Sequence, residues 1–252
     1  MNKFIIFSYG GGTQSIAMSI LIAQGKLPTP DMIVFADTGD EATETWEWMY
    51  ERVQPLLAHT VYRAIHIANH SWAMVDTYGK NGDLLMPAYT QAGKLPTFCS
   101  QEWKTYVVRR YLRSWSVDRC DMWMGMSTDE IRRLKQSDVK WITNRYPLCL
   151  GYGIAMNRME CAKLVRDTFG LEPPKSSCVY CPHRRDPQWQ RLKVFYPADF
   201  AKAVAKDKQI RANDQMGGVW LHESRIPLDE IDFTKQSDQL ELIPCESGIC
   251  WT

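Results

Sequence analysis

The chain lacks a charge excess of either sign: its 252 residues include 30 lysines and arginines and 29 acidic residues, which gives a net charge of +1. This balance excludes a protein that coats nucleic acid by bulk charge, although it is compatible with a local basic groove. The chain also lacks an apolar run near the roughly 20 residues that cross a bilayer. Its first apolar run is short and ends in glycines, unlike a signal peptide, so we expect a cytoplasmic protein without membrane contact.

The composition is typical of a globular protein, with 23% charged and 45% apolar residues. The length suffices for one large α/β domain, alone or with an appendage. Ten tryptophans indicate a large aromatic core or, alternatively, a platform on which bases stack. In a reducing cytosol, the eight cysteines favour metal binding or catalysis over disulfides.

Short apolar runs alternate with amphipathic stretches in the first half of the chain. This pattern predicts strands at residues 4–7, 32–35, 61–67 and 121–126, and helices at residues 13–24, 43–57 and 100–115. Such alternation is typical of an α/β fold, in which helices cover both faces of a parallel sheet. Residues 69–98, which glycines and prolines interrupt, are expected to form a long loop or lid.

After Pro147 the pattern changes to two helical stretches, at residues 157–169 and 187–211, with a cysteine-rich turn at residues 176–185 between them. We therefore predict an α/β domain over residues 1–150. A mostly helical, cysteine-rich C-terminal region over residues 151–252 is expected to pack on it.

Three adjacent glycines lie between the first expected strand and the first expected helix, within the sequence SYGGGTQS at residues 8–15. Glycine lets backbone N–H groups approach an anion closely, and the start of a helix adds partial positive charge. The segment has neither the Walker lysine nor the glycine pattern of dinucleotide-binding proteins. It predicts a phosphate-binding loop of another kind, the alternative being a plain strand-to-helix turn.

This loop resembles the PP-loop, the pyrophosphate-binding loop of the adenine nucleotide α-hydrolase superfamily. Residues 35–41, FADTGDE, resemble the second-strand signature of the phosphoadenosine phosphosulfate (PAPS) reductase-like family, and residues 125–130, GMSTDE, with the arginines after them resemble a third segment of that family. The loop differs from the family pattern by an extra residue, Tyr9, and by Gln14 in place of the usual Asp. The resemblance spans residues 4–185 and implies a Rossmann-like, HUP-type sheet.

The resemblance implies a site for ATP, or for PAPS, together with Mg²⁺. Asp37 ends the second strand, where open α/β sheets bind ligands, so it would contact ribose, phosphate or Mg²⁺ unless it caps the helix that begins near Thr43. The residues implied in nucleotide binding are Ser8, Gly10, Gly11, Gly12, Thr13, Gln14, Ser15, Asp37, Thr38, Gly125, Glu130 and Arg133. The implied catalytic residues are Lys104, Asp37 and Cys250.

Cys178 and Cys181 form a C-x-x-C pair, and Cys99 lies far upstream at the start of an Arg-rich helix. Iron–sulfur sulfonucleotide reductases have a Cys-Cys pair at a similar distance before a C-x-x-C. The resemblance therefore implies a [4Fe–4S] cluster with these three cysteines as ligands.

The fourth ligand is open, because Ser100 stands where the reductases have their second cysteine. Cys161 is the first candidate by position, and the tail cysteines Cys245 and Cys250 are the alternative. Zinc, with His183 as a further ligand, is the competing metal. A redox-active C-x-x-C and plain structural cysteines are the remaining readings.

Lys104 follows Cys99 at the Cys-x-x-x-x-Lys spacing of the reductase family. Reductases of this family end in Glu-Cys-Gly-Leu-His, whose cysteine attacks the substrate sulfur; here the tail order differs, and Cys250 or Cys245 would be the working thiol. Six arginines join Lys104 as a candidate basic rim for a polyanionic substrate, although such side chains are as often simply solvated. They are Arg109, Arg110, Arg132, Arg133, Arg184 and Arg185.

The resemblance leads to a first hypothesis: an enzyme that binds ATP, cleaves the bond between its α and β phosphates and adenylates an acceptor for iron–sulfur-dependent sulfur transfer. The acceptor would be a nucleic acid or a small molecule, and a cysteine desulfurase or a thiol reductant would be the partner, with a homodimer as one assembly. The second hypothesis is a reductase of PAPS or adenylylsulfate. The third is a non-catalytic, metal-stabilised module that binds nucleotide or nucleic acid.

Overall fold

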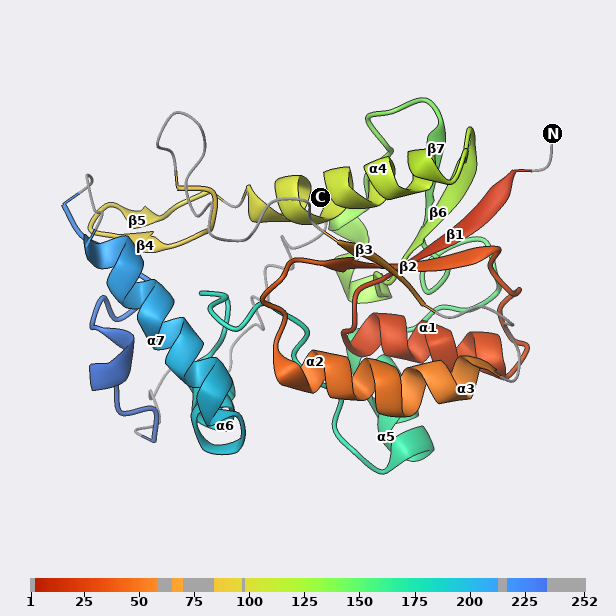
Figure 1. Ribbon diagram of the computed structural model, residues 1–252. Helices are drawn as coiled ribbons and strands as arrows, with labels where there is room; N and C mark the ends of the chain where they lie inside the picture. The colour runs from red at the N-terminus through yellow and green to blue at the C-terminus, as the bar shows by residue number, and fades with distance from the viewer. Residues whose placement is uncertain (1–2, 59–64, 70–83, 97, 213–216, 235–252) are drawn as a thin grey trace. The chain divides into compact units, whose positions relative to one another are not determined.

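The computed structural model describes residues 3–58, 65–69, 84–96, 98–212 and 217–234 (Figure 1). They form two compact units, each assembled from separate stretches of the chain. The sheet unit takes its residues from 1–37, 44–70 and 106–176, and the cysteine unit from 38–43, 71–105 and 177–252. The sequence boundary at residue 150 does not coincide with these divisions, because the segment up to residue 176 packs with the sheet.

The sheet unit contains five parallel strands in the order β3-β2-β1-β6-β7. Their bounds are β1 Phe4–Tyr9, β2 Met32–Asp37, β3 His66–Asn69, β6 Cys120–Met124 and β7 Ile142–Arg145. The chain runs outward from β1 to β3 and then returns to the other side of β1. The strand order therefore reverses at β1, and open α/β sheets bind ligands at the carboxyl ends of the strands at such a switch point.

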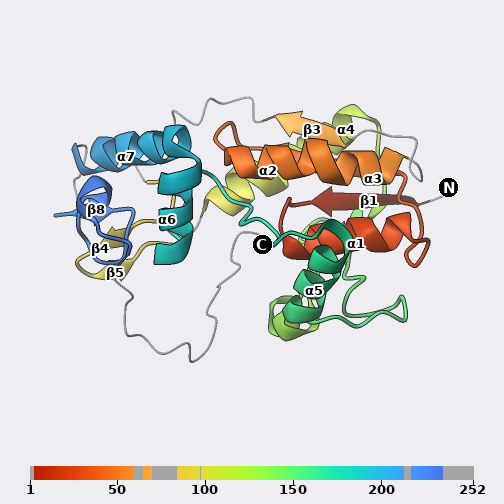
Figure 2. The ribbon, with the colours of Figure 1, turned by 90° about the horizontal axis from the view of Figure 1, so that it is seen from below.

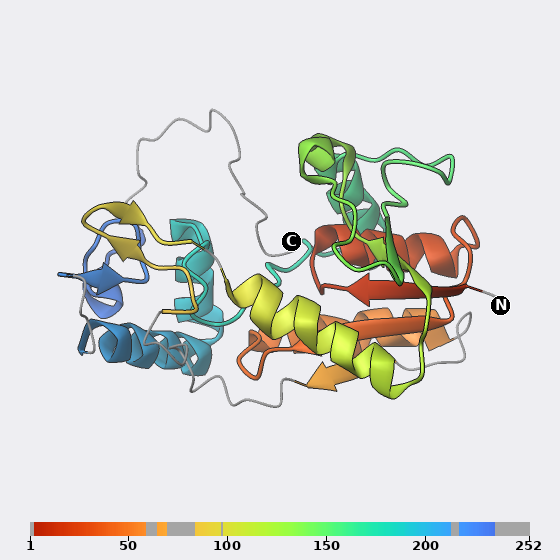
Figure 3. The same ribbon diagram turned by 90° about the horizontal axis from the view of Figure 1, so that it is seen from above.

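Helices cover both faces of this sheet, as Figures 1 and 3 show. On one face lie α1 (Thr13–Ala23), α2 (Thr43–Trp48), a π-helical turn (Met49–Val53), α3 (Gln54–Ala58) and α5 (Arg158–Phe169). On the other lies α4 (Tyr106–Ser114). Adjacent strand residues such as Ile6 and Phe7 are both buried, on opposite faces, as expected for a strand between two helical layers. The predicted α/β, Rossmann-like fold is confirmed.

Helix α5 shows why the sheet unit extends past residue 150. Asn157 and Glu160 form a capping box at its start, and Gly170 ends it in the left-handed conformation. Its buried residues Cys161 and Val165 pack in the same core as α1. The apolar face of this helix is therefore buried within the sheet unit. Figure 2 shows α5 beside α1.

The cysteine unit has a small antiparallel sheet in the order β5-β4-β8, with helices α6 and α7. The bounds are β4 Tyr89–Thr90, β5 Gly93–Lys94, β8 Val219–Trp220, α6 Asp186–Phe195, α7 Pro197–Ala212, a π-helical turn Gln101–Thr105 and a 3₁₀ turn Leu228–Glu230. The fully buried carboxylate of Asp207 accepts hydrogen bonds from the amides of Leu221 (3.0 Å) and Leu228 (3.1 Å), which ties three segments together.

The stretch expected as a lid, residues 69–98, is partly structured. Its described part contains the β4–β5 hairpin, and Leu84, Met86 and Ala88 are buried in the core of the cysteine unit. Residues 70–83 and 97 lie outside the described residues. Among the described helices, none is long and apolar enough to cross a membrane.

Candidate functional site

The glycine loop joins β1 to α1 in the sheet unit. Gly12 precedes the first helical residue in an extended conformation, with φ −93° and ψ 176°, and no side chain of the described residues caps the helix. The first amides of an α-helix have no carbonyl partner within the helix, and the helix dipole makes this end positive. The loop therefore leaves a bare helix start, suited to an anion, at the carboxyl end of β1.

Gly11 shows that part of this loop accepts glycine alone. Its φ is +73°, and a Cβ there would lie 2.8 Å from Cγ2 of Thr45 and 3.1 Å from Oγ of Ser176. The Ser176 hydroxyl donates a hydrogen bond to the carbonyl of Gly10. Helix α2 and the segment at residue 176 thus hold the loop from two sides.

The loop after β6 packs against the start of α1. Ser8 and Met124 are paired in the register of β1 and β6, so the two loops leave the sheet next to each other. A Cβ on Gly125 would lie 3.0 Å from the backbone nitrogen of Ser15, so a larger residue would push the two loops apart. The structure therefore brings Gly125 and the glycine loop together.

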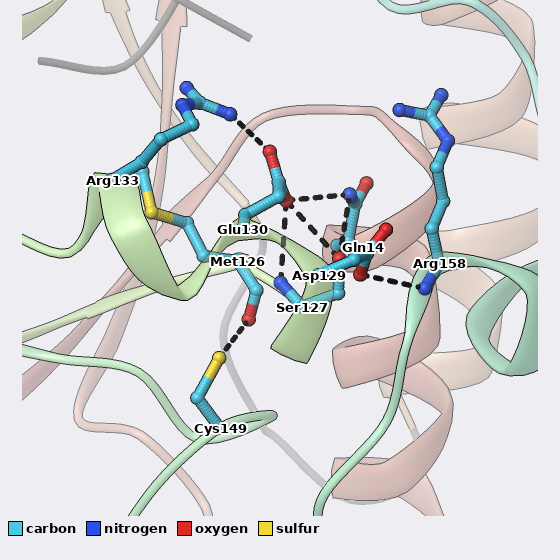
Figure 4. Close-up of polar contacts among 8 residues, drawn as sticks. All are labelled: Gln14, Met126, Ser127, Asp129, Glu130, Arg133, Cys149 and Arg158. Carbon is cyan, nitrogen blue, oxygen red and sulfur yellow. Dashed lines mark hydrogen bonds and ion pairs between the residues drawn. The ribbon is translucent and has the colours of Figure 1, made fainter. Parts of the chain in front are cut away.

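Glu130 is the centre of a polar network in these loops, shown in Figure 4. Its carboxylate accepts hydrogen bonds from Nε2 of Gln14 (2.9 Å) and from the amide (3.3 Å) and hydroxyl (3.2 Å) of Ser127. Nε2 of Gln14 also donates to the Ser127 hydroxyl at 3.3 Å. Arg133 forms an ion pair with the same carboxylate.

This network gives Glu130, Gln14 and Arg133 distinct roles. Glu130 caps the 3₁₀ turn Thr128–Arg133 and orients the Gln14 amide, so its charge is used within the protein. Nη2 of Arg133 is buried and has no hydrogen-bond partner among the described residues. An unsatisfied guanidinium N–H favours an anionic ligand, and Glu130 links this arginine to Gln14 in the first turn of α1. Ser127, which is not among the predicted site residues, is recognisable in the sequence as the N-cap of an S-x-x-E capping box.

Asp37 ends β2 and is half-buried, whereas Ser8, Thr13 and Ser15 are buried. The alternative role of Asp37 as a helix cap is filled by another residue. Asp199 accepts hydrogen bonds from the amide (2.7 Å) and the hydroxyl (3.0 Å) of Thr43, the first residue of α2.

A buried ion pair lies in the cysteine unit. Nζ of Lys104 is 3.2 Å from Oε1 of Glu41, and these residues are only 8% and 5% exposed. The Thr38 hydroxyl lies 3.3 Å from the same Glu41 oxygen and 3.2 Å from Sγ of Cys178. Burial, followed by the Glu41 charge, raises the pKa of the Cys178 thiol, with Lys104 and Thr38 acting in the opposite direction.

Three candidate cluster ligands, Cys99, Cys178 and Cys181, lie in the cysteine unit. Burial, together with Cys181, raises the pKa of Cys99 to about 12 against the opposing charge of Lys104. Cys178 and Cys181 lie on one turn, in which the Cys181 amide donates to the Cys178 carbonyl at 3.1 Å. Arg184 is buried and donates to the carbonyls of Ser177 and Cys178, so it braces this turn.

Cys161 lies in the apolar core of the sheet unit and is fully buried, and burial raises its pKa to about 12. Cys245 and Cys250 lie outside the described residues. Nδ1 of His183, the zinc candidate, is 2.6 Å from Nζ of Lys94. Within the described ranges, no three His, Cys, Asp or Glu side chains are grouped as metal ligands. The described side chains therefore do not form a complete ligand set, and the [4Fe–4S] cluster stays a prediction.

Replacing Cys161 with alanine tests whether this thiol is a ligand or part of the core. As a core residue, it should cost about 1 kcal/mol of unfolding free energy when its sulfur is removed. Iron and zinc per chain, measured after anaerobic purification, should equal those of the unmodified protein. A loss of metal in this variant, with Cys120→Ala as the buried-cysteine control, would instead identify Cys161 as a ligand.

The candidate basic rim is distributed over both units. In the sheet unit, Arg109 forms an ion pair with Asp138, and its hydrogen bond holds the pKa of that carboxyl below the usual range. Arg132 is exposed on the 3₁₀ turn that carries Arg133. In the cysteine unit, Lys104 and Arg184 are buried and make protein contacts. Of these five, Arg133 belongs to the network around Glu130, and Arg132 precedes it on the same turn.

No known protein family matches the chain, and no curated protein matches its sequence. Among solved structures, it is similar to a phosphoadenylyl-sulfate (PAPS) reductase from Candida auris in complex with phosphate. The sequence identity is 12% and the TM-score 0.47, over 71% of this chain and 82% of the other.

Proposed function

We propose that the sheet unit binds the phosphates of ATP on the glycine loop and that the protein uses ATP to adenylate an acceptor. The observation that carries this proposal is the uncapped start of α1 behind three glycines, at the carboxyl end of β1, where the strand order reverses. Gly11 keeps the loop backbone open, and Nη2 of Arg133 supplies an unpaired donor nearby in the same unit. Asp37, at the end of β2, is the proposed contact to ribose or Mg²⁺.

In this proposal, the chemistry at the loop is charge stabilisation. Cleavage between the α and β phosphates places negative charge on departing pyrophosphate, and fixed backbone amides stabilise that charge without reorganising. Gln14, whose amide nitrogen donates to Glu130 and Ser127, holds the segment after β6 against the start of α1. Sulfur transfer to a nucleic acid or a small molecule would follow adenylation, and Lys104 stays a predicted catalytic residue.

Nucleotide preference and product identity test this function. We expect Mg-ATP to bind more tightly than AMP in a calorimetric titration, because AMP lacks the phosphates that the loop would hold. Release of pyrophosphate on adding an acceptor, followed with a coupled pyrophosphate assay, would support adenylation. Sulfite release from PAPS with a thiol reductant would favour the reductase instead. Failure to bind either nucleotide would refute both functions.

A further inference from the structure

A second group of polar side chains lies in the cysteine unit, apart from the glycine loop and the candidate metal ligands. Asp186 begins α6, and His222 and Ser224 follow β8, both elements shown in Figure 2. Nε2 of His222 is 2.9 Å from Oδ1 of Asp186, and Nδ1 is 2.8 Å from Oγ of Ser224. His222 is 5% exposed, and the ring of Phe233 packs edge-on against it at 5.8 Å.

The hydrogen bonds fix where the proton of the neutral imidazole lies. The amide of Ser224 donates to Nδ1 of His222 at 3.2 Å, so Nδ1 bears a lone pair and the ring proton is on Nε2. Oδ1 of Asp186 accepts a hydrogen bond from this N–H. The Ser224 hydroxyl then donates to Nδ1, the arrangement in which a base withdraws the proton of a nucleophile while a carboxylate orients the base.

A nucleophile must be accessible to its substrate, whereas its base must be held in place. Ser224 is exposed, whereas His222 is buried and held from both sides. The residue after the serine, Arg225, is a non-glycine residue in the left-handed conformation, with φ +58°. That turn presents the serine hydroxyl at the surface while the base stays fixed.

We propose that Ser224 is an activated nucleophile that accepts acyl groups from activated esters, with His222 as base and Asp186 as the orienting carboxylate. The two nearest amides are already used, because Ser224 N–H bonds to Nδ1 and Arg225 N–H to the His222 carbonyl at 3.0 Å. Neither is available to stabilise an oxyanion, so the substrate class is limited to thioesters or aryl esters, whose leaving groups are good.

The reaction balances with water as the only other reactant. The Ser224 oxygen attacks the acyl carbon, its proton passes to Nδ1 of His222, and the bond to the leaving group breaks. The leaving group takes the proton from His222. Water, deprotonated by the same nitrogen, then releases the carboxylic acid and restores the serine.

The test is covalent labelling of the full-length protein with a fluorophosphonate probe, in which Ser224 displaces fluoride, quantified by peptide mass spectrometry. Ser114 is the matched control, because it is exposed and its hydroxyl donates to the Tyr111 carbonyl instead of to a histidine. We expect Ser224 to react about 100-fold faster than Ser114. Asp186→Asn should slow labelling at least about 10-fold, and Ser224→Ala should abolish the labelled peptide.

Aryl acetate hydrolysis should follow the same order in these variants, with Ser114→Ala matching the unmodified protein. Labelling of Ser224 no faster than Ser114, in unmodified protein, would overturn the proposal whatever the folding of the variants. Labelling that is fast but insensitive to Asp186→Asn in a folded variant, checked by circular dichroism, would overturn the role of the Asp–His pair. In either case, the contacts would serve only to hold the turn after β8.

Discussion

Replacing Gly12 with alanine is expected to raise the dissociation constant for Mg-ATP by about 10- to 100-fold while leaving the fold intact. The φ of Gly12 is −93°, which alanine adopts freely, and its Cβ would meet Ser176 at 3.6 Å, an ordinary contact. The added methyl would occupy the surface that a phosphate must approach. Losing one or two charge-assisted hydrogen bonds corresponds to about 1.5–3 kcal/mol, which gives this range. Isothermal titration calorimetry measures it.

Gly25, at the other end of α1, provides the matched control. Its φ is +69° and a Cβ there would meet nothing within 4 Å, so Gly25→Ala strains the backbone without touching the loop. We expect this variant to lose about 1 kcal/mol of stability and to bind ATP normally. The two variants thus separate binding from folding. Unchanged ATP affinity in a folded Gly12→Ala protein would show that phosphates bind elsewhere.

Replacing Glu41 with alanine is expected to lower the unfolding free energy by about 3–5 kcal/mol, because it leaves the buried ammonium of Lys104 without this carboxylate. The Glu41 side chain is completely buried and that of Lys104 is only 10% exposed, so water cannot replace the lost contact. Urea denaturation, followed by circular dichroism, measures the change.

Two further variants identify the origin of this effect. Adding Lys104→Met to Glu41→Ala removes the buried charge that has lost its carboxylate, and the double variant should be more stable than Glu41→Ala alone. Asp167 pairs with Lys163 on α5, where the side chains are 58% and 70% exposed, so Asp167→Ala should cost at most about 0.5 kcal/mol. Equal losses of unfolding free energy in Glu41→Ala and Asp167→Ala would contradict the role of Glu41 in a buried ion pair.

The parts of the fold with strong periodicity were predictable. The apolar runs that became β1 and β2 and the helical pattern of α1 each carry their own signal, and the parallel sheet follows from their alternation. The strands of the cysteine unit span two residues each, too few to show any period. The pairing of β4 with β8 joins residues more than 100 positions apart in the chain, which local patterns do not encode.

The residues of the candidate site likewise divide into those that have a local sequence signal and those that do not. The hydrogen bond between Gln14 and Glu130 joins the glycine loop to the segment at residues 125–130, and each of these motifs is recognisable in the sequence by itself. The burial of Glu41 had no local signal, because its stretch is acidic and its partner, Lys104, comes from a distant helical turn. For Cys161 a signal existed, since it lies four residues before Val165 on one face of α5, a spacing typical of a core position.

The discontinuity of the cysteine unit has a consequence for its synthesis. The described residues of 38–43 and 84–105 leave the ribosome before those of 177–234, on which they depend: the amide of Ala42, for example, bonds to the carbonyl of Ser177. Because synthesis proceeds at roughly 5–20 residues per second, several seconds pass between the synthesis of these early segments and that of their partners. During that interval the apolar side chains of Leu84, Met86 and Trp103 have no core to enter, which makes the nascent chain a natural client for chaperones.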